Sequence, residues 1–150
     1  MNKKQIFWAG SEDDLKGYLS LMTVENLTAF AGKLDQTETA QERPYRMQGS
    51  TAVLDIAGPM IASDNPFAEM FGYTTYPSLL RKLDAISKDA EVTDVILAID
   101  SGGGAVSGLT AVAQKIRQVS AEGKPVTAFS EGHMLSAAYW LGSSADKIVV

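Results

Sequence analysis

The sequence predicts an α/β fold built on a largely parallel sheet. Three observations carry this prediction: a nearly unbroken apolar run at 94–99, helical apolar patterns on either side of it at 77–88 and 106–121, and a short apolar run at 125–130. Apolar runs that alternate with helical patterns indicate βαβ units, whose strands lie parallel and are joined by right-handed crossovers. We therefore expect one main sheet with helices packed against it.

Residues 1–50 are predicted to form a helical N-terminal segment and a polar linker. Apolar residues at helical spacing cover 11–22, and a second stripe of them covers 24–34. Residues 35–50 are polar, contain Pro44 and lack periodicity, which is typical of a linker or an extended arm. The two stripes are interpreted as packing surfaces rather than as parts of a catalytic site.

Residues 51–150 are predicted to form the main domain. A β-rich run at 51–57 opens this part of the chain. The strand at 94–99 is so apolar that we expect it to be covered on both faces. A further helix is expected to start at Ser136, directly after the last predicted strand.

The connection between Gly58 and Tyr76 is unusually rich in large apolar side chains. A solvent-exposed loop rarely carries so many of them. Two interpretations remain open: the loop packs locally on the sheet, or it covers a groove or faces another subunit.

Composition excludes several classes of function. The net charge of -5 and the lack of a basic cluster argue against nucleic acid as a partner. With no cysteine and one histidine, neither a disulfide nor a zinc site is expected, and nothing indicates a cofactor. The first apolar run, at 6–9, is too short for a signal peptide or membrane anchor. We therefore expect a cytoplasmic protein without a membrane anchor in this chain.

Ser136 lies where the predicted strand at 125–130 gives way to a helix of small residues. Such a hydroxyl can be an ordinary N-cap. It can also be a nucleophile, because the unpaired amides of a first helical turn favour the negative charge on an attacked carbonyl oxygen. The glycines at 102–104 follow the strand at 94–99 and can bring further amides close. Because both segments leave the carboxyl ends of parallel strands, we expect them to meet.

These segments resemble a known family, the Ser-Lys peptidases of the ClpP-like fold, which include signal peptide peptidase A and the phage capsid (prohead) proteases. The resemblance covers about 51–150 and rests on the blocks at 53–60, 95–104 and 136–148. It implies a ClpP/crotonase-like βαβ spiral, of which residues 51–150 would be the N-terminal part.

The resemblance also implies roles for individual residues. Ser136 would be the catalytic nucleophile, and Gly103, Gly104 and Ala137 would form the oxyanion hole. Gly102 stands where the family usually has proline, so this loop lacks a fixed φ and should be more flexible. Substrates would be segments of scaffold and capsid proteins, cleaved by a homo-oligomer in the host cytoplasm or the prohead.

A serine nucleophile needs a general base, and none is evident among these residues. His133 is the only histidine, and nothing nearby is expected to orient its ring. Lys147 is the only lysine after Ser136 and is expected at the far end of the helix. The family's base is a lysine downstream of the serine, which we expect beyond residue 150. The apolar run at the end of the chain indicates a truncated domain, so the 150-residue fragment is expected to be inactive.

Two other functions fit the same fold. A crotonase-like acyl-CoA enzyme also uses paired backbone amides, but it has no need of a serine at position 136. A catalytically inactive structural or assembly protein is compatible with the acidic charge and with the apolar loop at 58–76.

Overall fold

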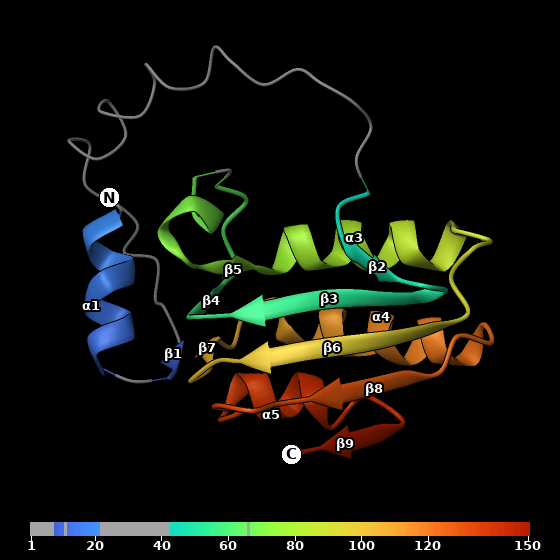
Figure 1. Ribbon diagram of the computed structural model, residues 1–150. Coiled ribbons are helices and arrows are strands. Elements are labelled where there is room, and N and C mark those ends of the chain that lie inside the picture. The colour runs from blue at the N-terminus through green and yellow to red at the C-terminus, as the bar shows by residue number, and fades with distance from the viewer. Residues whose placement is uncertain (1–7, 11, 22–42, 66) are drawn as a thin grey trace, which may run out of the picture.

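The computed structural model describes residues 8–10, 12–21, 43–65 and 67–150. Figure 1 shows a layer of nearly aligned strands with helices behind it. The second predicted helical stripe, at 24–34, lies outside the described residues.

The main sheet has five strands, and its core is parallel. Strands β3, β6, β8 and β9 lie side by side in chain order, and β2 pairs antiparallel with β3 at the edge. The predicted α/β fold with a mostly parallel sheet is therefore confirmed, and it is consistent with a ClpP-like fold. The strands are β2 (Arg46–Gln48), β3 (Thr51–Ala57), β6 (Asp94–Asp100), β8 (Val126–Phe129) and β9 (Lys147–Val149).

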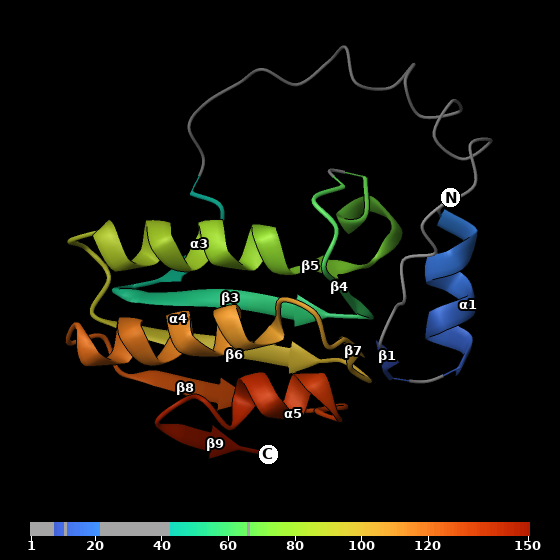
Figure 2. The same ribbon diagram turned by 180° about the vertical axis from the view of Figure 1, so that it is seen from behind.

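Three helices cover one face of this sheet, as Figures 1 and 2 show from opposite sides. They are α3 (Tyr76–Lys88), α4 (Leu109–Ala121) and α5 (Ala137–Gly142). The Thr75 hydroxyl caps α3 by accepting the Ser78 N–H at 3.2 Å. The apolar stripes of α3 and α4 pack on the sheet to form the core, which contains Leu79, Leu83, Ile86, Val112, Ile116 and Val119.

The opposite face of the sheet differs from the expectation that the strand at 94–99 is covered on both faces. Burial along β6 alternates, so Ile96 and Ala98 point away from the helices and are only half-buried. Together with Val53, Phe129 and neighbouring residues they line an open hollow of about 450 Å³. Among the described residues this strand is therefore covered on one face only, because no described helix lies across the other.

The connection from 58 to 76 forms part of a second, small sheet. Its strands run in the order β1 (Trp8–Ala9), β7 (Gly104–Ala105), β4 (Met60–Ile61) and β5 (Thr74–Thr75). Met60, Ile61 and Tyr73 are buried, whereas Met70, in the short 3-10 helix η2 (Glu69–Phe71), is 60% exposed. Local packing therefore accounts for most of the apolar residues in this connection.

The N-terminal fifty residues contribute to both sheets. Helix α1 (Glu12–Leu21) agrees with the first predicted helical stripe. Residues 46–48 differ from the predicted linker, because they form β2, and Arg46 donates to Asp55 on β3 at 2.9 Å. This strand is paired through its backbone and carries no apolar pattern that the sequence could reveal.

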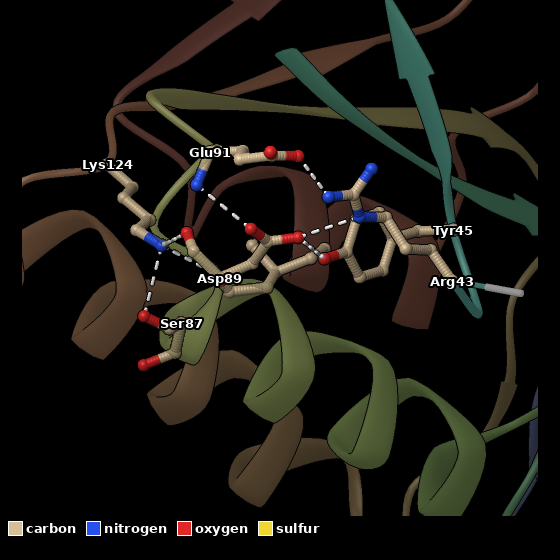
Figure 3. A network of polar contacts seen from close by, with 7 residues as sticks. Arg43, Tyr45, Ser87, Asp89, Glu91 and Lys124 are labelled. Carbon is tan, nitrogen blue, oxygen red and sulfur yellow. Dashed lines mark hydrogen bonds and ion pairs between the residues drawn. The ribbon is translucent and has the colours of Figure 1, made fainter. Parts of the chain in front are cut away.

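Lys124 closes the carboxyl end of α3. Its ammonium donates to the carbonyls of Ile86, Ser87 and Asp89 at 2.6, 3.0 and 2.6 Å. In Figure 3 the Asp89 carboxylate lies next to this cap and holds Arg43, Tyr45 and the Glu91 amide. The cluster thus connects residues 43–45, which directly precede β2, to the end of α3.

We expect Lys124→Met to destabilise the fold by about 1–3 kcal/mol, because three helix-end carbonyls lose a charged donor. Chemical denaturation of the two proteins measures this difference. Lys88→Met is the matched control, since the one ion pair that Lys88 forms with a described residue is with the half-exposed Asp84, four residues away. Equal stability of the Lys124 variant and the parent protein would contradict the assigned cap.

Candidate active site

Ser136 occupies a backbone conformation that serine rarely adopts. Its φ of 51° and ψ of -117° make it the only non-glycine residue with positive φ in the described part of the chain. The Ala138 N–H donates to the Leu135 carbonyl at 2.9 Å, which closes a β-turn around Ser136. These angles match the first central residue of a type II′ turn, a position that usually carries glycine. The turn therefore holds a side chain at a strained position.

The Ser136 hydroxyl is not used to cap α5. No cap hydrogen bond involves the side chain, no described residue is hydrogen-bonded to its Oγ, and the residue is exposed. The ordinary N-cap interpretation therefore does not explain why serine stands here. A strained turn that presents an unengaged hydroxyl is the arrangement of a nucleophile elbow.

The glycine loop after β6 packs directly against this turn. Gly103 has a φ of 112°, and a Cβ placed on it would lie 2.9 Å from the Ser136 Cβ and 3.3 Å from the Ala137 nitrogen. The same Cβ would lie 2.5 Å from the carbonyl oxygen of Ala9. Only glycine fits this position. The structure thus brings together Ser136, Gly103 and Ala137, which the sequence predicts to act together.

Backbone hydrogen bonds fix the two segments to each other. The Ser101 N–H donates to the His133 carbonyl at 2.7 Å, and the Leu135 N–H donates to the Ser101 carbonyl at 3.1 Å. On the other side, the Met60 N–H donates to the Gly103 carbonyl at 3.0 Å. The carboxyl ends of β3, β6 and β8 are therefore joined around the Ser136 turn, as expected for a site in a parallel sheet.

The backbone amides of the expected oxyanion hole differ in their bonding. The Ala137 N–H has no acceptor among the described residues, whereas the Gly103 N–H donates to the buried Ser101 hydroxyl at 3.1 Å. Gly104 lies one residue further on, in β7, where a Cβ would lie 2.0 Å from the Met60 carbonyl oxygen. One amide is therefore available to a ligand, and a second one lies close to it.

Asp100 is the residue that sequence reasoning missed. Its carboxylate accepts the His133 N–H at 2.9 Å and lies 3.5 Å from the His133 Nδ1. The hydrogen bond from this backbone N–H, aided by the imidazole, lowers the pKa of Asp100. The expectation that nothing is placed to orient His133 is therefore wrong. The signal was available, because Asp100 ends β6 and His133 follows β8, the neighbouring parallel strand.

Neither Asp100 nor His133 is enclosed. Their side chains are 70% and 73% exposed, and no described hydrogen bond joins His133 to Ser136. Lys147 pairs with Thr127 near the amino ends of β8 and β9, whereas Ser136 follows the carboxyl end of β8. Lys147 therefore lies near the amino ends of the parallel strands, and Ser136 lies beyond their carboxyl ends.

An open, mainly apolar hollow of about 720 Å³ flanks the turn. It lies between the end of β8, α5 and β9, and its lining includes Phe129, Met134, Tyr139 and Ile148 but not Ser136 itself. Among the described residues, no cluster of three or more His, Asp or Glu side chains could hold a metal ion. No described helix is both long and apolar enough to span a membrane.

Known proteins with similar sequences are proteases and a phage head protein. Capsid assembly protease C of Escherichia phage lambda is 29% identical over 131 residues, which cover 87% of this chain and 30% of that protein. Protease 4 of Haemophilus influenzae is 30% identical over 124 residues, or 83% of this chain and 19% of that protein. The chain is a homologue of these proteases. The predicted resemblance to phage capsid proteases and signal peptide peptidase A is therefore confirmed.

A third relative is the head-tail preconnector protein GP5 of Enterobacteria phage P21. It is 31% identical over 108 residues, which cover 72% of this chain and 21% of that protein. The chain thus spans at most 30% of the length of these three relatives. No family model matches the chain.

Proposed function

We propose that this chain carries the nucleophile and the oxyanion hole of a serine endopeptidase of the phage capsid-maturation or signal peptide peptidase A type. The observation that carries the proposal is the Ser136 turn. A serine with glycine-like backbone angles presents its hydroxyl beside Gly103 and beside the Ala137 amide, and no described residue is hydrogen-bonded to either group. Backbone strain of this kind is retained where function needs it. The protease relatives favour this function over acyl-CoA chemistry.

In the proposed reaction, the Ser136 Oγ attacks the carbonyl carbon of a substrate peptide bond while a base takes its proton. The oxyanion accepts hydrogen bonds from the amides of Ala137 and Gly103, with Gly104 holding the loop in place. The amine leaves with a proton from the base, and water then hydrolyses the acyl-enzyme. We assign the base to a lysine beyond residue 150, kept neutral by desolvation. Lys147 lies near the amino ends of the strands, away from Ser136, and is therefore not placed for this role.

The proposed substrates are extended segments of capsid and scaffold proteins. Two relatives are named for capsid assembly and the head-tail preconnector, which supports this class. A segment added as a strand beside the glycine loop would carry its carbonyl to Ser136. In this proposal residues 51–150 form the N-terminal part of the peptidase domain, and a homo-oligomer acts in the host cytoplasm or within the prohead.

Cleavage of an unfolded protein such as β-casein by the full-length protein tests this function. We expect cleavage by the parent protein and a loss of at least about 1000-fold in Ser136→Ala, because the reaction loses its nucleophile. Ser143→Ala is the matched control, since Ser143 is also exposed but lies at the other end of α5. Cleavage that persists in Ser136→Ala would refute the proposal, and a folded parent protein without any cleavage would favour an inactive assembly protein.

A further inference from the structure

Ser101 is a polar residue that is only 2% exposed, and its hydroxyl is used twice. The hydroxyl donates to the Gly58 carbonyl at 2.6 Å and accepts the Gly103 N–H at 3.1 Å. A third contact, with the Gly103 carbonyl, is 3.5 Å long. A hydroxyl has one hydrogen, which the shortest contact assigns to Gly58, so a lone pair remains to hold the Gly103 amide.

The Gly103 N–H therefore points at a buried hydroxyl rather than at a substrate. The other proposed donor, the Ala137 N–H, has no acceptor among the described residues. One donor is thus ready to bind an oxyanion, and the other is engaged inside the chain. An oxyanion hole that uses both amides must release Gly103 from Ser101.

The peptide unit between Gly102 and Gly103 can rotate about its flanking Cα bonds with little hindrance. The bond to Ser101 is the only hydrogen bond from a described residue that holds this unit, since none engages the Gly102 carbonyl. The next carbonyl, that of Gly103, is anchored by the Met60 N–H at 3.0 Å. Glycine on both sides of the unit gives it access to angles closed to other residues. Rotation is therefore confined to one peptide unit.

We propose that Ser101 is a positioning residue that holds the Gly103 amide away from Ser136 until a substrate binds. This inference rests on the proposed function and adds a form of regulation to it. The developing oxyanion competes with the Ser101 hydroxyl for the Gly103 N–H, and its negative charge makes it the stronger acceptor. The resting site is only half formed, which limits reaction with compounds that do not fill the site.

The test is the rate at which a small fluorophosphonate labels the full-length protein. A neutral hydrogen bond changes an equilibrium by about 2- to 12-fold, so Ser101→Ala should be labelled about 3- to 10-fold faster than the parent. Ser101→Thr keeps the hydroxyl and should be labelled at the parent rate. Ser130→Ala is the matched control, because Ser130 is also buried but its hydroxyl has no hydrogen-bond partner among the residues that the structure describes.

The outcomes separate this inference from the proposed function. If neither the parent nor any folded variant is labelled, the proposed function is refuted, and this inference with it. Labelling of the parent with an equal or slower rate in folded Ser101→Ala would overturn this inference alone. Should Ser101→Ala fail to fold, glycine-selective NMR of the parent decides. We expect the Gly103 amide proton to be protected from exchange and to shift downfield once Ser136 carries the phosphonyl group; an unprotected amide would overturn the inference.

Discussion

Gly103→Ala is expected to lower peptidase activity by at least about 100-fold and to destabilise the fold by at least about 2 kcal/mol. The loss of activity follows from displacing one oxyanion donor. The loss of stability has two causes. The φ of 112° is unfavourable for alanine, and the new Cβ would lie 2.5 Å from the Ala9 oxygen and 2.9 Å from the Ser136 Cβ. Casein cleavage by the full-length protein and denaturant titration measure the two effects.

Gly123→Ala separates backbone strain from steric conflict. Gly123 also has a positive φ, 96°, but nothing lies within 4 Å of a Cβ built there. We expect this control to lose about 1 kcal/mol of stability and no activity. Should Gly103→Ala cleave casein as fast as Gly123→Ala does, the Gly103 loop would have no part in the reaction.

Ser136→Gly and Ser136→Ala are expected to be equally inactive but to differ in stability. Glycine adopts the φ of 51° and ψ of -117° without a Cβ penalty, whereas alanine keeps the strain of the native serine. The glycine variant should therefore be more stable than the alanine variant by about 1 kcal/mol, or about 3 °C in Tm for a domain of this size. Thermal unfolding of both variants measures the difference.

Position 143 supplies the control for this pair. Ser143 is exposed and follows α5 with a φ of -70°, an angle at which alanine is unstrained. There the order should reverse, with the glycine variant less stable than the alanine variant. An alanine variant at position 136 as stable as the glycine variant would mean that the turn stores no strain.

The sequence reveals the main sheet because its strands and helices carry their own patterns. The apolar run of β6 and the helical stripes of α3 and α4 place three elements within a few residues of their observed bounds. The strands β1, β4, β5 and β7 have two residues each, too few for any periodicity. An apolar run also cannot tell which face will be covered, so the half-exposed side of β6 was beyond sequence reasoning.

The candidate site was predictable in its parts but not in its conformation. The glycines at 102–104 and the serine at 136 are residue types typical of such a site. Loops that follow the carboxyl ends of parallel strands lie close together, so the two segments were expected to meet. The positive φ of Ser136 was not predictable, because local preference puts glycine or asparagine there. It is maintained by bonds that only the fold supplies, among them the link between Ser101 and Leu135. The hydrogen bond from the Gly103 N–H to the Ser101 hydroxyl was not predictable either. It depends on a buried side chain that also bonds Gly58, in a separate connection of the fold.

The most direct test of the central claim is to locate a fluorophosphonate adduct by peptide mass spectrometry. The folded full-length protein is treated with the probe, digested and sequenced by fragmentation. A single adduct on Ser136 is the expected result, because among the described residues its hydroxyl is the one that combines a strained turn with a facing glycine loop. An adduct on another serine, or none on a folded protein that cleaves casein, would contradict the assignment of Ser136 as the nucleophile.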